Sequence, residues 1–342
     1  MILAYHGFQL IGSQISLGRP WGLDVPWPRA NNPFLAVVVE GHSAVSLFIV
    51  LSGFILSHGV LSRDIDYRGF LLARCLRIYP MMILCLVMAI AVAAADLATI
   101  INSIVPVDSR SGIVSPFTAM FWAVKIELQC YLLFPAMLWM MKTRGIKVLL
   151  FIVLLAFVLR VAAVLGAGAS ARDVSYWTLV GRVDQFVIGM MAAKLFKDHG
   201  AKISPLWFVP SAIIAVAMLV VLNRLGGWPT QASWRTAFPP IEAFVWAAFI
   251  VTYLIVGKFL HRKVSALIAA LGAVSYSAYL LHYVIIEAVI KQKAFLTFTG
   301  RADWDAIVTS LAIVFPITTL IATLTYHLVE KPFMAIRPKY AH

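Results

Sequence analysis

The chain has 342 residues, of which 62% are hydrophobic and 13% are charged, and its formal net charge is +13. Soluble globular chains are about 45–50% apolar and about 25% charged, so this composition excludes a soluble enzyme, a disordered chain and a fibrous protein. The long unbroken apolar runs exclude a transmembrane barrel, whose strands alternate over about ten residues. The sequence therefore predicts an all-α fold, a polytopic membrane bundle of helices, with the lipid bilayer as its surroundings.

Apolar runs of the length needed to cross a bilayer, about 20 residues, predict ten transmembrane helices. These runs cover residues 1–17, 34–60, 78–100, 117–141, 147–168, 176–196, 206–222, 238–259, 264–290 and 306–329. Every gap between them is short, and the sequence contains no internal repeat. Residues 1–342 are therefore expected to form a single integral-membrane domain without a soluble C-terminal domain.

The basic residues are distributed unevenly over the gaps between these runs. Alternate gaps and the tail carry Arg63, Arg68, Arg74, Arg77, Lys142, Arg144, Lys147, Lys194, Lys197, Lys202, Lys258, Arg262, Lys263, Lys331, Arg337 and Lys339. The remaining gaps carry only Arg19, Arg29, Arg110, Arg172, Arg224, Arg235, Lys291, Lys293 and Arg301. Because cytoplasmic loops are enriched in Lys and Arg, both termini are predicted to be cytoplasmic, as an even number of spans requires. The net positive charge is therefore interpreted as a consequence of the membrane topology, and no nucleic-acid partner is expected.

The predicted fourth span contains two ionisable side chains, Lys125 and Glu127. Each costs about 2.5–3.5 kcal/mol near the bilayer centre, so this span needs partners or water within the bundle. Two residues apart on a helix, the two side chains point to different sides and cannot pair well. Each is expected to find its partner on another helix, either in a structural ion pair or at a functional site.

Other polar residues also fall within predicted spans. In the ninth, Ser275, Tyr279 and His282 follow a helical spacing that places them on one face, which suits either helix packing or a site. In the sixth, Arg182 is expected to have a role inside the bundle, although it could also snorkel outward. Arg160 in the fifth span is interpreted as a packing or snorkelling residue.

Single histidines and cysteines give weaker signals. His6 and His42 lie in the first two spans, where a lone histidine is more often a core residue than a catalyst. The three cysteines, Cys75, Cys85 and Cys130, are widely spaced in apolar sequence, which indicates neither a disulfide framework nor a metal site. No metal is therefore expected.

Six segments, in order along the chain, resemble the motifs of acyltransferase family 3. They are AVSLFIVLSGFIL (44–56), RCLRIYP (74–80), FWAVKIELQCYLLFP (121–135), GRVDQFVIGM (181–190), LGAVSYSAYLLH (271–282) and VEKPF (329–333). The family patterns are G-V-x-x-F-F-x-x-S-G-F, R-x-x-R-I-x-P, W-S-L-x-x-E-x-x-F-Y-L-L-x-P, R-x-D-x-F-x-x-G, L-G-x-x-S-Y-x-x-Y-L-x-H and E-x-P. The resemblance covers almost the whole chain.

The resemblance implies a multi-pass enzyme of the cell (inner) membrane that transfers an acyl group, usually acetyl. The donor would be cytoplasmic acyl-CoA (acetyl-CoA) as co-substrate. The acceptor would be a hydroxyl of a carbohydrate, such as an exopolysaccharide, lipopolysaccharide, oligosaccharide or glycoside. By the same resemblance, His6 and Glu127 are the catalytic candidates, and Arg74 and Arg77 are the candidates for binding CoA.

These assignments lead to a mechanistic hypothesis. Neutral imidazole suits a general base near neutral pH, so His6 would take the proton of the acceptor hydroxyl. Glu127 would orient or stabilise that imidazole, although the two roles could be exchanged. Guanidinium groups suit phosphate, which favours a CoA-binding role for Arg74 and Arg77 over a purely topological one. Substrate binding or oxyanion stabilisation is expected from Arg182, Ser275, Tyr279 or His282, and a Ser or Cys acyl-enzyme stays open as an alternative.

The sequence departs from the family pattern at several positions. Ala123, Val124 and Ile49 replace the Ser and Leu of the fourth-span motif and a Phe of the second-span motif. Family members carry a basic residue about ten positions before the first-span histidine, but His6 is too close to Met1. Either the first helix is truncated at its N-terminus, which is the expectation here, or the chain is an inactive relative.

A transporter of a small anionic or sugar solute is the alternative function for a bundle with buried charges. It would carry inverted halves and paired broken helices, and the sequence indicates neither.

Overall fold

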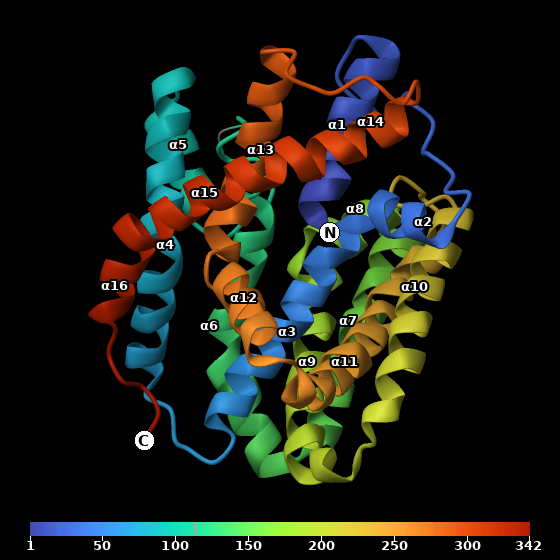
Figure 1. Ribbon diagram of the computed structural model, residues 1–342. Coiled ribbons are helices and arrows are strands. Elements are labelled where there is room, and N and C mark those ends of the chain that lie inside the picture. Colours follow the sequence, from blue (N-terminus) through green and yellow to red (C-terminus); the bar gives the residue numbers. More distant parts are fainter. Residues whose placement is uncertain (113) are drawn as a thin grey trace.

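The computed structural model describes residues 1–112 and 114–342, and these residues form a bundle of helices (Figure 1). No strand occurs within this part of the chain, although an isolated antiparallel bridge pairs Ile65 with Ala341. The helices up to residue 144 are α1 (Ile2–Leu17), α2 (Pro33–Val39), α3 (Ala44–Val60), α4 (Tyr67–Val92), α5 (Leu97–Ile104) and α6 (Phe121–Arg144).

The second half of the chain continues the bundle. Its helices are α7 (Ile146–Val161), α8 (Ala171–Trp177), α9 (Leu179–His199), α10 (Phe208–Arg224), α11 (Phe238–Val256), α12 (Arg262–Ala273), α13 (Ser275–Lys291), α14 (Ala302–Thr309), α15 (Phe315–Thr325) and α16 (Lys331–Ala335). The π-helical turns η7 (Ser310–Val314) and η8 (Tyr326–Glu330) join the last three helices into one long element. In Figure 1 this element crosses the other helices obliquely.

The all-helical membrane fold predicted from composition is confirmed. Within the described residues, seven helical segments are long and apolar enough to cross a membrane, and the pair α12 and α13 makes an eighth candidate. The other two predicted runs correspond to α1, which has 16 residues, and to α9, which carries Arg182, Asp184 and Lys194 among its apolar residues.

Two boundaries differ from the sequence-based expectation. Helix α4 begins at Tyr67, so Arg74 and Arg77 lie within a helix and not in the gap before it. The side chain of Asp66 caps this helix by accepting hydrogen bonds from the backbone N–H groups of Arg68 and Gly69, and such a cap starts a helix regardless of how apolar its first turns are. The predicted run 264–290 is two helices, α12 and α13, bent by 64°.

Small residues allow α3 and α9 to pack closely in the centre of the bundle. A Cβ atom on Gly53 of α3 would collide with the carbonyl oxygen of Phe186, and a Cβ atom on Gly189 of α9 would collide with that of Val50. Glycines commonly permit such close approach between membrane helices. The Ser-Gly-Phe step of the second-span motif therefore has a packing role, and the contact fixes Ser46 and Ser52 of α3 relative to α9.

Replacing Gly53 with valine is expected to destabilise the bundle by about 1–3 kcal/mol, the usual cost of overpacking. Gly59 lies on the same helix, and a Cβ atom added to it would meet no other atom within 4 Å. Gly59→Ala is therefore the matched control and should leave stability unchanged or slightly raised. Thermal unfolding of the detergent-purified protein measures both. Equal melting temperatures for Gly53→Val and Gly59→Ala would contradict the packing role.

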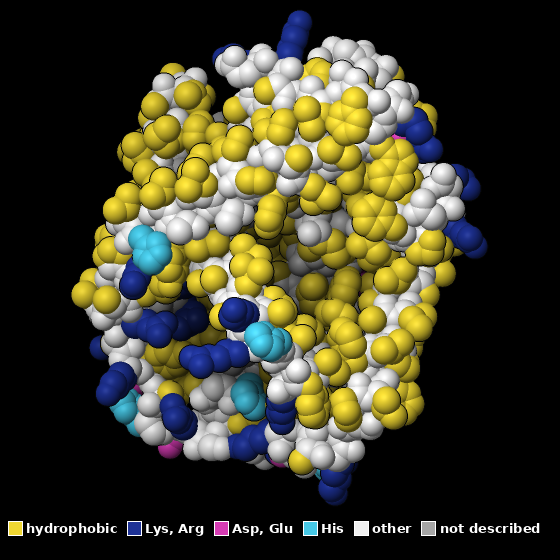
Figure 2. All heavy atoms as spheres, viewed as in Figure 1, with side chains coloured by type: hydrophobic (Ala, Val, Ile, Leu, Met, Phe, Trp, Pro, Cys, Tyr) yellow, Lys and Arg dark blue, Asp and Glu magenta, His cyan; other side chains and the backbone are white. Residues whose placement is uncertain are grey.

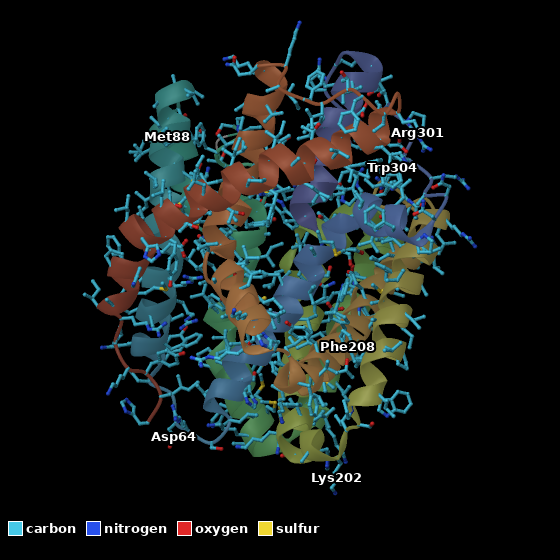
Figure 3. The ribbon with its side chains drawn as sticks, in the orientation of Figure 1. Asp64, Met88, Lys202, Phe208, Arg301 and Trp304 are labelled. Atoms are coloured by element: carbon cyan, nitrogen blue, oxygen red, sulfur yellow. The ribbon has the colours of Figure 1, made fainter. Side chains whose placement is uncertain are left out.

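The two ends of the bundle differ in which segments they contain. Asp64 and Lys202 lie at one end, and Met88 and Arg301 lie toward the other (Figure 3). The C-terminus lies at the end with Asp64, whereas the first residue lies at mid-height of the bundle (Figure 1). Backbone hydrogen bonds between Asp64 and His342 attach the C-terminal tail to the segment before α4. Helix α1 therefore runs from the middle of the bundle to the end opposite the C-terminus.

Candidate functional site

Glu127 lies on α6 in the interior of the bundle, with 4% of its surface exposed. Its carboxylate accepts hydrogen bonds from the Ser52 hydroxyl, at 2.7 Å, and from the Tyr131 hydroxyl. Ser52 belongs to the second-span motif and Tyr131 to the fourth-span motif. The partner that Glu127 was expected to find on another helix is thus a hydroxyl of α3 and not a basic side chain.

A cavity of about 170 Å³ adjoins Glu127 and is called the Glu127 cavity below. It lies between α1, α3, α6 and α13, and its walls include Ile2, Phe48, Glu127, Ser275, Tyr276 and Tyr279. The Tyr279 hydroxyl is buried and has no hydrogen-bond partner within the described residues. An unpaired buried hydroxyl calls for an explanation, and here it can donate to a group bound beside Glu127.

Arg77 of α4 adjoins this cavity through an aromatic side chain. The Arg77 guanidinium lies 5.7 Å from the ring centroid of Tyr276, which lines the cavity. Arg77 also donates to Glu330, with 2.7 Å between Nη1 and Oε2, and Glu330 accepts a second hydrogen bond from Ser277. The closing E-x-P motif is thus joined to the R-x-x-R motif of α4 and to the motif on α13.

Arg74 lies one turn earlier on α4 and contacts the C-terminal tail. Its guanidinium lies 5.5 Å from the Tyr340 ring centroid, and its Nη2 donates to the Tyr340 hydroxyl at 3.3 Å. Its Nε is buried and unpaired within the described chain. Figure 2 shows Lys, Arg and His side chains gathered around a hollow over α4, α12 and α16. The basic residues of these three helices and of the tail after α16 are Arg68, Arg74, Arg77, Arg262, Lys263, Lys331, Arg337 and Lys339.

His6 of α1 forms a hydrogen bond with His282 of α13, at 2.8 Å between Nδ1 and Nε2. The other ring nitrogen of His282, Nδ1, lies 2.7 Å from the carbonyl oxygen of Tyr279 and 3.2 Å from that of Ala278. Carbonyl oxygens only accept, so His282 Nδ1 carries the proton and its Nε2 accepts. His6 Nδ1 must then be the donor, and neutral His6 keeps an unprotonated Nε2 that can accept a proton.

The structure brings some of the predicted site residues together and leaves others apart. Ser275 and Tyr279 line the same cavity as Glu127, and His282 lies one turn further along α13 beside His6. Within the described chain, Glu127 and His6 make no hydrogen bond to each other, so Glu127 does not orient this imidazole by direct contact, and its charge-stabilising role stays a prediction. His282 uses both ring nitrogens for His6 and the backbone, which leaves neither for a substrate.

Arg182 is buried inside the bundle but does not reach the Glu127 cavity. Its guanidinium donates to the Ser46 hydroxyl at 2.6 Å and to the Gln185 side chain at 3.1 Å, and it lies 4.4 Å from the Tyr176 ring centroid. The space beside it is about 10 Å³, which admits at most one water molecule. A substrate contact by Arg182 therefore has no room in this conformation.

Several buried charges around Arg182 were missed by sequence reasoning. Glu242 of α11 accepts hydrogen bonds from Ser43, Ser46 and Gln185. Glu40 bonds His42 at 2.9 Å and also accepts from Trp27 and Asn223. Glu242 is a single carboxylate in an otherwise apolar run of sequence. The same pattern identified Glu127, so it could also have identified Glu242.

Two further charged residues have structural partners. Lys125 donates to the backbone carbonyl oxygens of Asn102, Asp108 and Ser111, so it holds the segment before α6. Among the described residues it forms no ion pair. Arg160 is fully buried and donates to Asp184 at 2.7 Å, which agrees with the packing interpretation and contradicts the snorkelling one. A buried pair of this kind is costly to break.

Comparison with known proteins agrees with the motifs. The sequence matches the family model described as an acyltransferase domain over residues 1–327. No curated protein and no solved structure matches the chain. With nearly all of its 342 residues covered by that family model and several apolar helices of membrane-spanning length, this multi-pass membrane protein belongs to acyltransferase family 3.

Proposed function

We propose that the protein is an O-acyltransferase that moves an acetyl group from cytoplasmic acetyl-CoA to a hydroxyl of a carbohydrate. The observation that carries this proposal is the way segments far apart in sequence meet around the Glu127 cavity. Ser52 bonds Glu127, Tyr276 lies under Arg77, and Glu330 joins Arg77 to Ser277. The cavity adjoins the basic surface through Tyr276, and its wall residue Ile2 lies one turn before His6, a histidine with an available nitrogen. This arrangement suits transfer from an anionic donor to a neutral hydroxyl.

In the proposed topology, ten helices lie across the inner membrane, of which α1 begins at mid-height, and the basic end of the bundle faces the cytoplasm. The Lys and Arg side chains over α4, α12 and α16 (Figure 2) support this orientation. An even number of spans directs both termini toward the cytoplasm. The phosphates of CoA would then bind at Arg74 and Arg77, and the pantetheine arm would extend past Tyr276 into the Glu127 cavity.

The chemical step begins with proton removal by His6. Its Nε2 takes the proton of the acceptor hydroxyl while the oxygen attacks the thioester carbonyl carbon, which is general-base catalysis. The new carbon–oxygen bond forms, the carbon–sulfur bond breaks, and the proton passes to the departing CoA sulfur. Tyr279 can donate its unpaired hydroxyl to the carbonyl oxygen as negative charge develops there. The role proposed for Glu127 is to stabilise the positive charge that His6 gains in this step.

His282 acts as a positioning residue in this proposal. His282→Ala removes the acceptor of the His6 Nδ1 proton and should lower kcat about 10- to 100-fold, with little change in the KM for acetyl-CoA. His282→Gln offers a side-chain oxygen in place of Nε2 and should recover part of that loss. Steady-state kinetics of both variants measure the effect, and equal activity of the two would show that the acceptor at this position is unimportant.

Arg74→Ala is expected to raise the KM for acetyl-CoA about 10- to 100-fold, because hydrogen bonds to charged groups contribute about 1.5–3 kcal/mol. The KM for the acceptor should change little. Arg144→Ala, an exposed arginine at the C-terminal end of α6, is the matched control and should change neither constant. Equal increases in both KM values of Arg74→Ala would reject the phosphate-binding role.

A direct assay separates the proposed reaction from transport, which the bent pair α12 and α13 would also suit. Purified protein in nanodiscs receives radiolabelled acetyl-CoA and a membrane glycan extract, and free CoA and labelled glycan are quantified. Transferase activity gives both products in equal amounts. Solute flux in proteoliposomes without release of CoA would instead support the transporter.

A further inference from the structure

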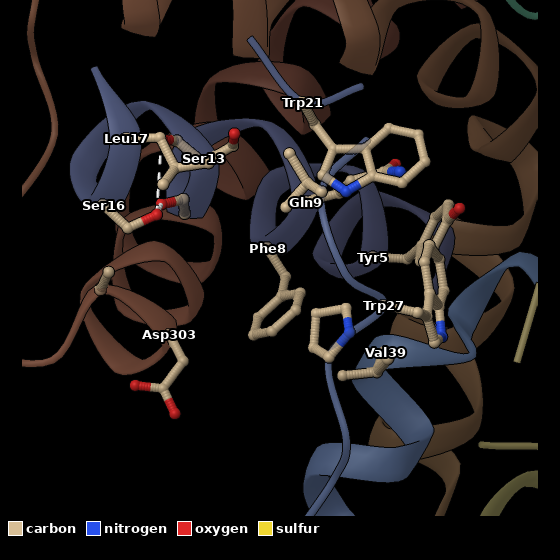
Figure 4. Close-up of a pocket in the computed structure, with 14 residues that line it drawn as sticks. Tyr5, Phe8, Gln9, Ser13, Ser16, Leu17, Trp21, Trp27, Val39 and Asp303 are labelled. Atoms are coloured by element: carbon tan, nitrogen blue, oxygen red, sulfur yellow. Dashed lines mark hydrogen bonds between the residues drawn. The ribbon is translucent and has the colours of Figure 1, made fainter. Parts of the chain in front are cut away.

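A second cavity lies further along α1 than the Glu127 cavity. Its volume is about 210 Å³, and it lies between α1, the segment before α2 and the start of α14. It is called the tryptophan cavity here because Trp21 and Trp27 form part of its wall, together with Tyr5, Phe8, Gln9 and Ser16 (Figure 4). In Figure 4, Tyr5, Trp21 and Trp27 lie on one side of the cavity, and Ser13, Ser16 and Leu17 lie on the other.

His6 lies on α1 close to residues that line each of the two cavities. Ile2, one turn before His6, lines the Glu127 cavity, whereas Tyr5 and Gln9 line the tryptophan cavity. The Tyr5 ring centroid lies 4.8 Å from that of His6. Residues three or four apart share a helix face, so His6 is within one turn of wall residues of both cavities. His6 lines neither cavity itself, and its neighbours on α1 link it to both.

The lining of the tryptophan cavity indicates the chemistry of its ligand. Two indole rings, Tyr5 and Phe8 supply flat apolar faces, and Gln9, Ser13 and Ser16 supply amide and hydroxyl groups. Ser13 and Ser16 donate their own protons to backbone carbonyls, so their oxygens are left to accept. Mixed aromatic and hydroxyl-bearing walls suit a ring with apolar C–H faces and hydroxyls at its edge.

Two more observations restrict the ligand further. The Trp21 Nε1 proton is buried and has no hydrogen-bond partner within the described residues, and such a donor normally has one. Among the described wall residues none is Lys, Arg or His, and Asp303 is the charged one. The lining thus offers no cation for a phosphate or carboxylate, and it offers an unused donor for a hydroxyl oxygen.

We infer that the tryptophan cavity binds a neutral saccharide and presents one of its hydroxyls to His6 from the side opposite the donor. The inference rests on the proposed function and adds the location of the acceptor to it. The donor then approaches from the basic end through the Glu127 cavity, and the acceptor approaches from the opposite end beside α1 and α14. Trp21 and Gln9 are binding residues in this arrangement.

Saccharide binding is tested on the full chain in nanodiscs by saturation-transfer NMR with defined probes. The probes are methyl α-D-glucopyranoside, methyl α-D-galactopyranoside, methyl α-D-mannopyranoside and, as an anionic comparison, glucuronate. At least one neutral glycoside is expected to bind, and Trp21→Ala should weaken its binding about ten-fold or more. Gln9→Ala gives a milder variant should Trp21→Ala fail to fold. Trp139→Ala, which removes an exposed tryptophan of α6, is the matched control.

The outcomes separate this inference from the proposed reaction. Glu127→Gln should keep the saccharide signal whatever happens to acyl transfer, and acetyl-CoA should not compete with the glycoside. A wild-type protein that binds a glycoside but transfers no acetyl group supports the cavity and rejects the reaction. Absence of binding by all three glycosides, preference for glucuronate, or binding unchanged in both Trp21→Ala and Gln9→Ala would overturn the inference.

Discussion

Replacing His6 with alanine is expected to lower kcat for acyl transfer by about 10²- to 10⁴-fold, the range that a positioned general base contributes. The hydrogen bonds of His282 to the backbone and to His6 leave His6 Nε2 as the nitrogen that can accept a proton. Alanine removes that nitrogen and leaves both cavities in place. Release of free CoA and formation of acylated glycan by the purified variant measure the loss.

The control for His6→Ala is a histidine that lies away from both cavities. His199 is exposed at the C-terminal end of α9, so His199→Ala should keep the wild-type rate. Binding of acetyl-CoA should be equal in the His6→Ala and wild-type proteins, because the arginines of α4 are untouched. A His6→Ala protein with near-normal kcat would remove this residue from the mechanism.

Replacing Glu127 with glutamine is the second change for which a large effect is expected. The amide keeps the shape of the side chain, and its oxygen can still accept from Ser52 and Tyr131, which both donate to Oε1 of the carboxylate. The substitution therefore removes the negative charge and little else. Transfer should fall at least about 100-fold, which is typical when charge stabilisation in a desolvated site is removed. The assay is the same measurement of CoA and acylated glycan.

Glu287→Gln provides the matched control for this substitution. Glu287 is a partly buried carboxylate on α13, outside the Glu127 cavity, so its loss should leave transfer nearly unchanged. Ser52→Ala tests the same site more gently, since it removes one hydrogen bond to Glu127 and keeps the charge; its activity should lie between the wild type and Glu127→Gln. Full activity of Glu127→Gln would exclude an electrostatic role for this carboxylate.

Much of the fold was predictable because the free energy of moving an apolar segment from water into the bilayer depends on that segment alone. Runs of about 20 apolar residues must cross the bilayer as helices, and every predicted run corresponds to a helix or a pair of helices. Helix ends were harder to predict, because a cap such as Asp66 starts α4 well before its apolar part. The bend between α12 and α13 has no signal in hydropathy, since both halves are apolar.

The site was predictable in its residue types and less so in its contacts. A carboxylate in an apolar helix, such as Glu127, stands out because of its insertion cost. Which partner it finds depends on helix packing that hydropathy does not encode: Gly53 brings α3 against α9, and Ser52, the residue before it, bonds Glu127. The pairing of His6 with His282 joins residues 276 positions apart and was likewise beyond reach of local spacing.

The central claim is that His6 catalyses acetyl transfer from a donor bound at the basic end to an acceptor bound on the opposite side. Acetyl transfer across a sealed membrane tests this claim most directly. Proteoliposomes are prepared with radiolabelled acetyl-CoA enclosed and glycan acceptor outside, and protease accessibility of the C-terminal tail identifies molecules whose basic end faces inward. The account predicts labelled glycan outside and free CoA inside, both absent in His6→Ala. Label on glycan only when donor and acceptor share one compartment would contradict it.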